Sequence, residues 1–345
     1  MTAPDPWQMA MFSAKPYDIE TFEAAVDSRG LAHRVVPFKP RLSAETLPLA
    51  LGYPAVCPFV HDVLDAGVLE ALAGSGTRLI ALRCAGFNNV DLDAARRLGM
   101  TVARVPAYSP SSVAEHTVGL MLALNRHLHR AFNRVREGNF ELTGLLGFEM
   151  RGRTVGIVGT GQIGAKVASA LSGFGVRMLG HDLAENPECL ALGVEYVDLD
   201  RLFAESDIVT LHCPLTPKTH HLIDAARLAR SRPGLMIINT GRGALIDAPA
   251  VIEALKSGRV GALGLDVYEQ EESLFFHDRS NEVLQDDVFS RLLTFPNVII
   301  TGHQAFFTRD ALDEIAGTTL DNLDRFARGQ ALPPERVVVG QGAPA

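Results

Sequence analysis

The feature that most constrains the fold of this chain is a glycine-rich segment at residues 159–164, which has the sequence GTGQIG. The apolar run TVGIV, typical of a buried strand, comes directly before it at residues 154–158, and a helical pattern follows it. A second strand is predicted at residues 177–182 and ends in Asp182. This order of strand, turn, helix and strand predicts a parallel βαβ unit.

Each glycine of this segment has its own steric role in a dinucleotide site. Gly159 permits the tight turn, Gly161 lets backbone approach a pyrophosphate at the positive end of the helix, and Gly164 lets helix and strand pack closely. Asp182 is expected to bind the ribose hydroxyls of NAD, and because Leu183 follows it rather than Arg, NAD is preferred over NADP. The alternative is a structural glycine turn with a solvated Asp182, but the complete unit favours dinucleotide binding.

Apolar runs of strand length alternate with helical patterns along most of the chain. At 345 residues the length suggests about two domains, and the alternation predicts an α/β fold of doubly wound parallel sheets with helices on both faces. The predicted strands lie at residues 10–14, 35–38, 55–60, 79–84, 101–105, 154–158, 177–182, 194–197, 207–211, 235–239, 262–266 and 298–301.

Between and after these strands, the sequence predicts two longer helices. One begins at Pro110, has an extensive apolar surface, and turns basic between residues 126 and 136, which complements the helix dipole. The other is expected over about residues 308–328. Residues 138–153 look like a connector, whereas the tail after Pro333 is expected to be frayed and residues 1 to about 8 to be disordered.

The composition excludes several classes of protein. Hydrophobic residues make up 47% of the chain, which rules out disorder as its main state. The formal net charge of −8 argues against nucleic acid or an anionic membrane as a partner, and the longest apolar run, residues 118–124, is too short for a membrane span. The N-terminus does not resemble a secretory signal. The 4 cysteines have no zinc-like spacing, so we expect reduced thiols, no metal site and a cytoplasmic location.

Three polar residues, Arg242, Glu271 and His303, lie at or shortly after the carboxyl ends of predicted strands. Ligands bind outside these ends in an open α/β sheet, so the three side chains can converge although they are far apart in the sequence. Arg suits a carboxylate because its planar fork donates two parallel hydrogen bonds. His suits a proton donor near neutral pH, and a nearby Glu would orient the ring and stabilise the imidazolium.

These residues supply what the reduction of a 2-oxo acid needs. In this hypothesis Arg242 holds the substrate carboxylate, NADH delivers hydride to C2, and His303 protonates the carbonyl oxygen. Each residue also has an ordinary interpretation. Arg242 can form a surface salt bridge, His303 an incidental hydrogen bond, and Glu271 stands beside Glu269 and Glu272, from which its charge does not distinguish it.

Longer motifs make the sequence resemble the NAD-dependent D-2-hydroxyacid dehydrogenase family, most nearly the bacterial fermentative D-lactate dehydrogenases. The resemblance covers the chain from about Met11 to about residue 337. Its motifs are LRCAGFNNVD at residues 82–91, VPAYSP at 105–110, AEH at 114–116, the glycine segment, LHCPLT at 211–216, RGALID at 242–247, DVYE at 266–269, LFF at 274–276 and GHQAF at 302–306.

The resemblance implies a role for many individual residues. The implied catalytic residues are Arg242, the acid Glu271 and the proton donor His303. The implied substrate-binding residues are Gly86, Phe87, Asn88, Tyr108, Arg242 and Phe306. The implied cofactor-binding residues are Gly159, Gly161, Gln162, Ile163, Gly164, Asp182, His212, Cys213, Pro214, Thr219, Thr240, Gly241, Arg242, Asp266 and His303. Tyr108 can equally be a core or hinge aromatic, and for His116 a structural role in its helix is expected.

The fold that the resemblance implies has two Rossmann-like domains with a cleft between them. The NAD-binding domain, residues 110–304, is inserted into a discontinuous flavodoxin-like substrate domain made of residues 1–109 and 305–345. The long helix from Pro110 belongs to the dimer region in the family, so a homodimer or homotetramer is expected. The chain departs from the family at Gly241, where members usually carry Ser or Ala.

The implied activity is the reversible NADH-dependent reduction of a small 2-oxo acid, with the conversion of pyruvate to D-lactate favoured. Two alternatives stay open. One is a dehydrogenase for a bulkier 2-oxo acid such as phenylpyruvate, because a sequence does not measure the size of a pocket. The other is an NAD-sensing binding protein of the corepressor type, since some relatives of the family use NAD binding in this way.

Overall fold

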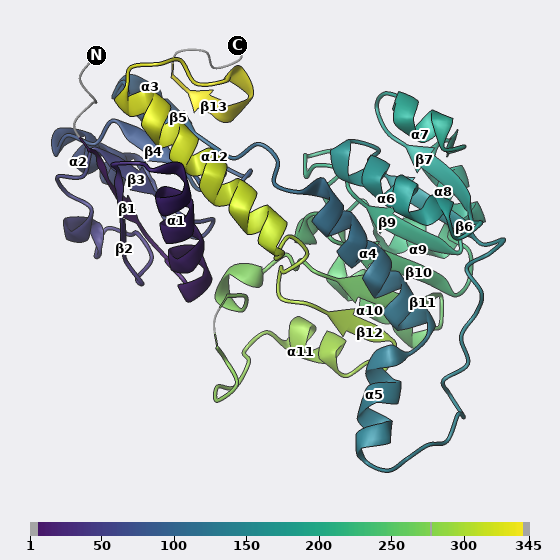
Figure 1. Ribbon diagram of the computed structural model, residues 1–345. Coiled ribbons are helices and arrows are strands. Elements are labelled where there is room, and N and C mark those ends of the chain that lie inside the picture. Colours follow the sequence, from purple (N-terminus) through teal and green to yellow (C-terminus); the bar gives the residue numbers. More distant parts are fainter. Residues whose placement is uncertain (1–5, 277, 341–345) are drawn as a thin grey trace. The chain divides into compact units, whose positions relative to one another are not determined.

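The computed structural model describes residues 6–276 and 278–340, and its chain divides into two compact units (Figure 1). Unit 1 consists of Met1–Ser109 and Phe307–Ala345, and unit 2 consists of Pro110–Phe306. Unit 2 is therefore an insertion in the chain of unit 1. The second junction lies close to the one at residues 304–305 that the sequence suggests.

Unit 1 contains a six-stranded sheet with the order β13-β5-β4-β3-β1-β2. Its strands are β1 (Gln8–Met11), β2 (Arg34–Pro37), β3 (Ala55–Cys57), β4 (Leu79–Ala81), β5 (Thr101–Ala103) and β13 (Val337–Val339). The first five are parallel, and their order 2-1-3-4-5 is that of the flavodoxin-like fold. This part of the predicted fold class is confirmed.

Helices α1 (Pro16–Arg29), α2 (Ala66–Gly74), α3 (Leu92–Arg97) and α12 (Arg309–Ala327) complete unit 1. Helix α12 packs against α1 and β4, so the last helix of the chain covers a sheet formed by the first hundred residues. Apolar side chains of α2 and α3 belong to a core cluster with residues of β1, β3, β4 and β5. Both ends of the chain are thus needed to bury this sheet.

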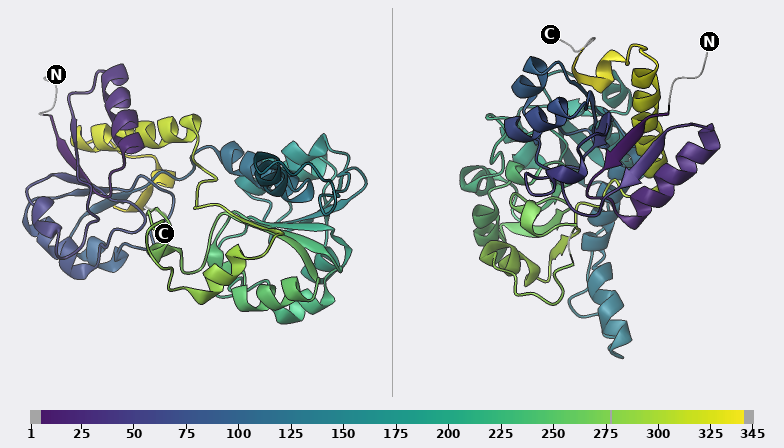
Figure 2. Two further views of the ribbon diagram at one scale, coloured as in Figure 1. Left: turned by 90° about the horizontal axis from the view of Figure 1, so that it is seen from below. Right: turned by 90° about the vertical axis from the view of Figure 1, so that its left-hand side faces the viewer.

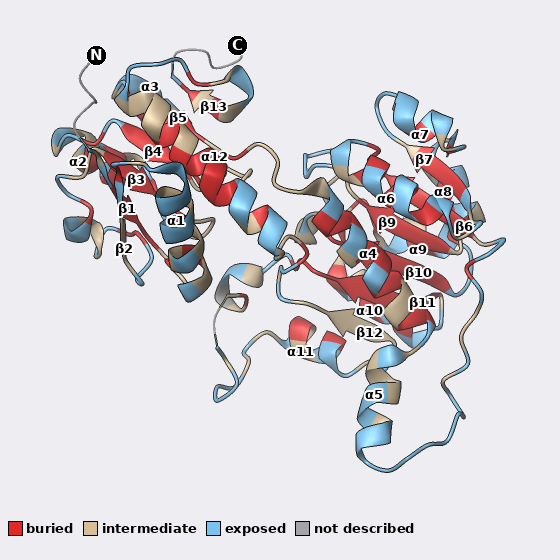
Figure 3. Cartoon of the chain, in the orientation of Figure 1, coloured by how far each residue is buried: buried red, intermediate tan, exposed pale blue. Residues whose placement is uncertain are grey.

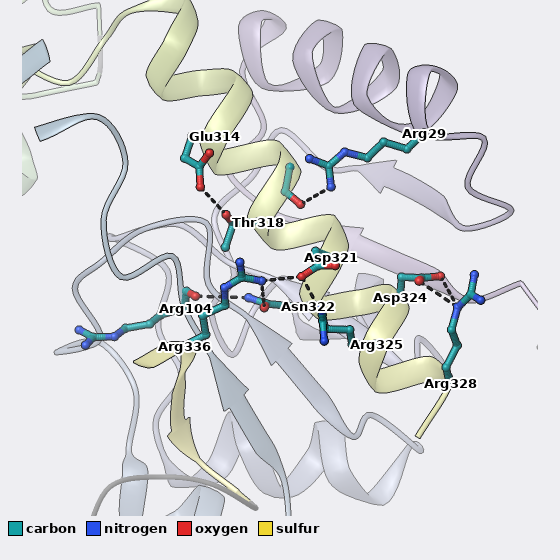
Figure 4. A network of polar contacts seen from close by, with 11 residues as sticks. Arg29, Arg104, Glu314, Thr318, Asp321, Asn322, Asp324, Arg325, Arg328 and Arg336 are labelled. Atoms are coloured by element: carbon teal, nitrogen blue, oxygen red, sulfur yellow. Dashed lines mark hydrogen bonds and ion pairs between the residues drawn. The ribbon is translucent and has the colours of Figure 1, made fainter. Parts of the chain in front are cut away.

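Polar contacts fasten α12 to the N-terminal part of unit 1 (Figure 4). The guanidinium of Arg29 in α1 donates to the carbonyl of Gly317 at 2.9 Å, and a Cβ at position 317 would make this guanidinium move. The amide of Asn322 donates to the carbonyl of Arg104 at 3.3 Å. These contacts are side chain to backbone, so they fix the position of the helix rather than merely neutralising charge.

The expectation of a frayed tail after Pro333 is wrong for the residues that the structure describes. Strand β13 pairs antiparallel with β5, and its Val337 and Val339 are buried. Arg336 at its start donates to Asp321 of α12 at 2.6 Å. The strand covers an otherwise open sheet edge, which is a common protection against pairing between molecules. Residues 341–345 and 1–5 lie outside the described part. The expectation of disorder is wrong for residues 6–8, because the N–H of Trp7 donates to Nδ1 of His33 at 3.1 Å and Gln8 begins β1.

Unit 2 contains a seven-stranded parallel sheet with the order β12-β11-β10-β9-β6-β7-β8. Its strands are β6 (Thr154–Val158), β7 (Arg177–His181), β8 (Glu195–Tyr196), β9 (Ile208–Leu211), β10 (Leu235–Asn239), β11 (Val260–Leu265) and β12 (Val298–Ile300). Numbered within the unit, the first six strands have the order 3-2-1-4-5-6 of a Rossmann fold, and β12 extends the sheet. The predicted doubly wound arrangement is confirmed.

Helices cover both faces of this sheet (Figure 2). Side chains of α4 (Pro110–Asn125), α6 (Gln162–Ser172) and α7 (Pro187–Ala191) form one core cluster with the strands. Side chains of α8 (Leu199–Glu205), α9 (Ala225–Arg230), α10 (Ala248–Lys256) and α11 (Asp287–Leu293) form the other. The inner strands β6, β9 and β10 are wholly buried, whereas the edge strand β12 is only partly buried (Figure 3). No helix within the described ranges has the length and apolarity needed to cross a membrane.

The single long helix expected from Pro110 is two helices, α4 and α5 (Leu128–Arg136). The break lies at His127, which has a left-handed φ of 49°. Two residues before the break, the side chain of Asn125 is clamped to Phe148: its amide donates to the carbonyl of Phe148 at 2.8 Å and its oxygen accepts from the N–H of Phe148 at 2.8 Å. Gly147 is required beside this clamp, since a Cβ would overlap the backbone of Asn125.

Candidate active site

The glycine segment lies at the point where the strand order of unit 2 reverses, between the carboxyl ends of β6 and β9. Gly159 has a φ of +91°, and a Cβ there would overlap the backbone of Cys213. A Cβ at Gly164 would overlap the carbonyl of Gly159. These two glycines are therefore required by the turn itself, whatever binds beside it.

Gly161 differs from its two neighbours, because a Cβ built on it meets nothing within 4 Å. It is the N-cap of α6, and it is exposed together with Gln162 at the start of the helix, whereas Ile163 is partly buried. Open space in front of a helix N-terminus fits an anionic group such as a pyrophosphate. The geometry thus agrees with the turn role of Gly159 and the packing role of Gly164, and the contact of Gly161 with a pyrophosphate stays a prediction.

Asp182 directly follows β7, and the buried residue Thr160 holds its carboxylate in place. The carboxylate accepts hydrogen bonds from the backbone N–H of Thr160 at 2.6 Å and from its hydroxyl at 3.2 Å, and the hydroxyl of Tyr196 donates to the Thr160 hydroxyl at 2.8 Å. Asp182 itself is exposed, so it is positioned and yet accessible to a ribose. The sequence singled out neither Thr160 nor Tyr196.

The loop after β9 carries His212, Cys213, Pro214 and Thr219. The Nε2 atom of His212 lies 2.9 Å from the hydroxyl of Thr210, and its Nδ1 atom is buried without a hydrogen-bond partner among the described residues. Burial lowers the pKa of His212 to about 3, so the ring is neutral. Burial also raises the pKa of the Cys213 thiol to about 11, so this cysteine is a packed thiol at neutral pH. The Thr219 hydroxyl donates to the carbonyl of Pro214 at 2.7 Å, which closes the turn.

Arg242 is presented by a short turn after β10. Asn239 shapes the turn, because its side chain accepts from the N–H of Gly241 at 3.0 Å and donates to the carbonyl of Arg242 at 2.9 Å. Arg242 is exposed, and its guanidinium donates to the carbonyl of Gly241 at 2.8 Å. Thr240 is buried, and its hydroxyl lies 2.9 Å from that of Thr117 in α4.

Gly243 brings this turn against the next loop of the sheet. A Cβ at Gly243 would overlap the backbone of Tyr268 and Glu269. The segment that carries Arg242 therefore packs directly on the segment that leads to Glu271. A side chain at position 243 would force the two apart.

Asp266, at the end of β11, organises the loop that carries His303. Its buried carboxylate accepts from the hydroxyl of Thr301 at 2.5 Å and from the N–H groups of Gln304 and Ala305, each at 2.8 Å. The Nε2 atom of His116 lies 3.1 Å from the Thr301 hydroxyl. In these contacts Asp266 has a structural role, and its predicted contact with a cofactor stays a prediction.

His303 and Glu271 are brought into direct contact. The Nδ1 atom of His303 lies 2.8 Å from Oε1 of Glu271, and the other carboxylate oxygen accepts from the N–H of Tyr268 at 2.9 Å. The rings of Phe276 and Phe306 flank the imidazole, with centroids at 5.8 and 6.4 Å. His303 has a left-handed φ of 55°, a conformation that a non-glycine residue keeps only where its surroundings enforce it.

The three proposed catalytic residues thus follow the neighbouring parallel strands β10, β11 and β12. Glu271 and His303 form a pair, and Arg242 lies on the adjoining loop. Of the other predicted substrate residues, Gly86, Phe87, Asn88 and Tyr108 belong to unit 1. There the guanidinium of Arg104 lies over the ring of Phe87 at 5.4 Å. Their contact with substrate stays a prediction.

Several residues that build the site escaped the sequence interpretation. Gly243 was visible as part of the RGALID motif, but its role comes from a close approach between two loops. Asn239 and Thr301 end or follow strands, and polar residues at such positions are the signal that could have identified them. Phe276 lies in the LFF motif of the resemblance, without a role assigned to it.

Comparisons with known proteins agree with this geometry. Residues 118–305 match the model of the NAD-binding domain of the D-isomer-specific 2-hydroxyacid dehydrogenases. The chain is 51% identical to a D-lactate dehydrogenase of Escherichia coli K12 over 330 residues, which cover 96% of this chain and 100% of that protein. It is also 46% identical over 328 residues to a 2-hydroxyacid dehydrogenase homologue of Zymomonas mobilis, with 94% and 98% coverage.

Solved structures have the same fold. The apo structure of Escherichia coli D-lactate dehydrogenase is similar with a TM-score of 0.88 and 48% identity, over 96% of this chain and 100% of that chain. An NAD-complexed D-isomer-specific 2-hydroxyacid dehydrogenase of Lactobacillus delbrueckii has a TM-score of 0.81 and 30% identity, with 96% and 100% coverage. With its glycine turn, its Rossmann strand order and this likeness over nearly the whole chain, the protein belongs to the NAD-dependent D-2-hydroxyacid dehydrogenases.

Proposed function

We propose that this enzyme reduces pyruvate to D-lactate in a reversible reaction, with Arg242, Glu271 and His303 as its catalytic residues. The observation that carries the proposal is the 2.8 Å contact between Nδ1 of His303 and Oε1 of Glu271. In this contact the Nδ1–H group donates to the carboxylate. Nε2 is therefore the nitrogen that exchanges a proton with the substrate. The D-lactate dehydrogenase of Escherichia coli, at 51% identity, supports pyruvate as the substrate.

NAD fits the residues around the glycine segment. The open space at Gly161 suits its pyrophosphate, and the exposed carboxylate of Asp182 suits its ribose. The buried, unpartnered Nδ1 of His212 offers a further polar contact at the same sheet edge. When bound as NADH, the cofactor supplies the hydride that reduces the carbonyl carbon of the substrate.

Arg242 acts as the anchor of the substrate carboxylate. Its guanidinium is exposed, and its hydrogen bond to a neighbouring carbonyl engages one nitrogen. The remaining N–H groups are available for a carboxylate, whose two oxygens match the planar fork. Because Gly243 packs on the segment that leads to Glu271, the anchor lies on the loop next to that of Glu271.

His303 gives its proton to the carbonyl oxygen as hydride arrives, and takes a proton from the hydroxyl in the reverse direction. Glu271 keeps the ring in one tautomer and one orientation, and is itself held by the N–H of Tyr268. Phe276 and Phe306 flank the ring with apolar surface. Low local polarity strengthens the interaction between the ring and the carboxylate.

A direct assay tests the proposal. The purified enzyme is mixed with NADH and a panel that contains pyruvate, phenylpyruvate and other 2-oxo acids, and the loss of NADH absorbance is followed. We expect the highest kcat/KM for pyruvate, and oxidation of D-lactate but not L-lactate in reverse. A preference for phenylpyruvate would assign a bulkier substrate, and NADH binding without turnover of any 2-oxo acid would refute the enzymatic role.

His303→Asn separates chemistry from folding, because Asn tolerates the left-handed backbone at this position. Loss of the proton donor is expected to lower kcat by about 10²–10⁴-fold, with little change in the Kd of NADH. Glu271→Gln is the matched variant, since it keeps the size of the side chain and removes its charge. A collapse of NADH affinity in His303→Asn would show that His303 serves the cofactor or the fold instead.

We also propose that the protein is a homo-oligomer, a homodimer or homotetramer, of the cytoplasm. Helix α5 exposes Leu128, Phe132 and Val135, and the connector that follows it exposes further large apolar side chains, Phe140, Leu142 and Leu146. Such a surface is typical of an interface between subunits. The 4 cysteines are free, as expected in a reducing compartment. Sedimentation equilibrium measures the oligomeric state, and a monomer at micromolar concentration would contradict it.

A further inference from the structure

Two adjacent histidines and a glutamate lie together on the surface of unit 2. Nε2 of His221 is 3.1 Å from Oε2 of Glu269, and Nε2 of His220 is 3.6 Å from Oε1 of the same carboxylate. The two imidazole rings are stacked, with centroids 3.9 Å apart and an angle of 24° between their planes. Each carboxylate oxygen thus faces a different ring nitrogen.

These distances suit a tetrahedral metal ion. Zinc binds His nitrogen and carboxylate oxygen at about 2.0–2.2 Å, so neighbouring ligand atoms in a tetrahedral site are about 3.3 Å apart. The separation between His221 and Oε2 of Glu269, 3.1 Å, is close to this value, and the 3.6 Å separation of His220 runs to the other oxygen, Oε1. One donor atom from each of the three residues lies within 4.8 Å of those from the others. Small side-chain movements would therefore bring three ligand atoms to one ion.

We propose that His220, His221 and Glu269 form a binding site for a first-row divalent metal ion of the zinc type. Two imidazoles and one carboxylate are ligands that zinc uses, and they suit nickel and copper as well, whereas magnesium prefers sites of oxygen alone. The side chains of His220 and Glu269 are 51% and 35% exposed, so an ion can enter and keep water at its remaining positions. The spacing of residues in the sequence did not reveal this site, because Glu269 is far from the histidine pair.

The ion pairs of Glu269 favour a metal ion over a lysine or arginine side chain as its partner. Among the described residues, the ion pairs that Glu269 forms are with these two histidines, and Lys or Arg takes no part in them. The N–H of His221 donates to the carbonyl of Ala244 at 2.8 Å. Glu269 belongs to the loop against which Gly243 packs. A bound ion would therefore join the segment of the histidines to the loop that leads to Glu271.

Zinc binding to the full-length enzyme tests the proposal. The chain is freed of metal with a chelator, and Zn²⁺ is titrated in competition with a chromogenic zinc indicator. The wild type is expected to bind one ion per chain at this site. Loss of a ligand costs at least as much as loss of a group that orients a ligand, so His220→Asn and Glu269→Gln should each weaken binding by about 10–100-fold or more.

Two controls make the result specific. His129→Asn removes a histidine of α5, whose Nε2 lies 3.1 Å from the carbonyl of Pro296, and is expected to bind Zn²⁺ as the wild type does. Excess Mg²⁺ should not displace Zn²⁺. Thermal unfolding with Zn²⁺ gives a second readout, since the ion should raise the Tm of the wild type and not that of His220→Asn. Unchanged zinc affinity in both His220→Asn and Glu269→Gln, or no stoichiometric zinc in the wild type, would overturn the proposal.

Discussion

A partly buried histidine at the switch point, whose Nδ1 atom is fully buried, makes a quantitative prediction about stability and pH. His212 has an ordinary pKa of 6.5 and, once folded, a pKa of about 3, because burial disfavours the charged ring. A pKa that is depressed by folding means that the unfolded chain binds the proton more tightly. The stabilisation is therefore complete above pH 6.5 and is lost as the pH falls from 6.5 towards 3.

The loss of stability at about pH 5 depends little on how far folding lowers the pKa of His212. A pKa of the folded state below about 4 leaves the ring neutral at about pH 5. The loss of stability is then set by the difference between this pH and the ordinary pKa of 6.5. A difference of about 1.5 units at about 1.36 kcal/mol per unit gives about 2 kcal/mol. Acidification from about pH 7.5 to about pH 5 should lower the free energy of unfolding by that amount through His212 alone.

A comparison with His212→Gln isolates the contribution. The variant keeps a polar atom near the hydroxyl of Thr210 and cannot take up a proton in this range. Urea unfolding of both cofactor-free proteins, followed by circular dichroism at the two pH values, cancels the titration of all other groups. The wild type should lose about 2 kcal/mol more than the variant. Equal losses would refute the assignment of a buried neutral ring.

Three further predictions concern the loops of the site. Arg242→Lys removes the fork that holds a carboxylate and should lower kcat/KM for pyruvate by about 10–100-fold, with a much smaller change in the Kd of NADH; equal damage to both would assign Arg242 to the cofactor. Gly161→Ala meets open space, so its free energy of unfolding should change by less than about 1 kcal/mol while its NADH affinity falls, as calorimetry would measure; unaltered affinity would contradict the cofactor site. Gly243→Ala would overlap the backbone of Tyr268 and should cost about 1–3 kcal/mol in urea unfolding, whereas unchanged stability would show that the two loops are not tightly packed.

Periodic local patterns were sufficient to predict most of the fold. The strands of both sheets are apolar runs bounded by turn residues, and the glycine segment carried its own context. The break at His127 was not predictable in this way, since it lies beside a clamp between Asn125 and Phe148, which are distant in the sequence. Strand β13 was hidden because the Gly and Pro residues of the tail outweighed its three valines.

The residues of the candidate site form the same two groups: those that local sequence predicts and those that depend on contacts between distant segments. Residues that follow strands closely, such as Arg242 and His303, could be selected from position and chemistry. Contacts between loops were not predictable, because they form only after the sheet has assembled. Gly243 packs on Tyr268, and Asp266 accepts hydrogen bonds from the loop of His303. The pairing of His221 with Glu269 belongs to this second class as well.

The insertion of unit 2 also sets the order in which a ribosome can complete the protein. All of unit 2 is synthesised before α12, the helix that packs on α1 and β4 of unit 1. While the 197 residues from Pro110 to Phe306 are made and fold, the first 109 residues lack the helix that packs on α1 and β4, and that face of their sheet is therefore only partly covered. Helix α12 and the edge strand β13 both follow unit 2 in the sequence, so both emerge after it. During synthesis, the half-finished unit 1 is thus the part of the chain with the greatest exposure to chaperones and to aggregation.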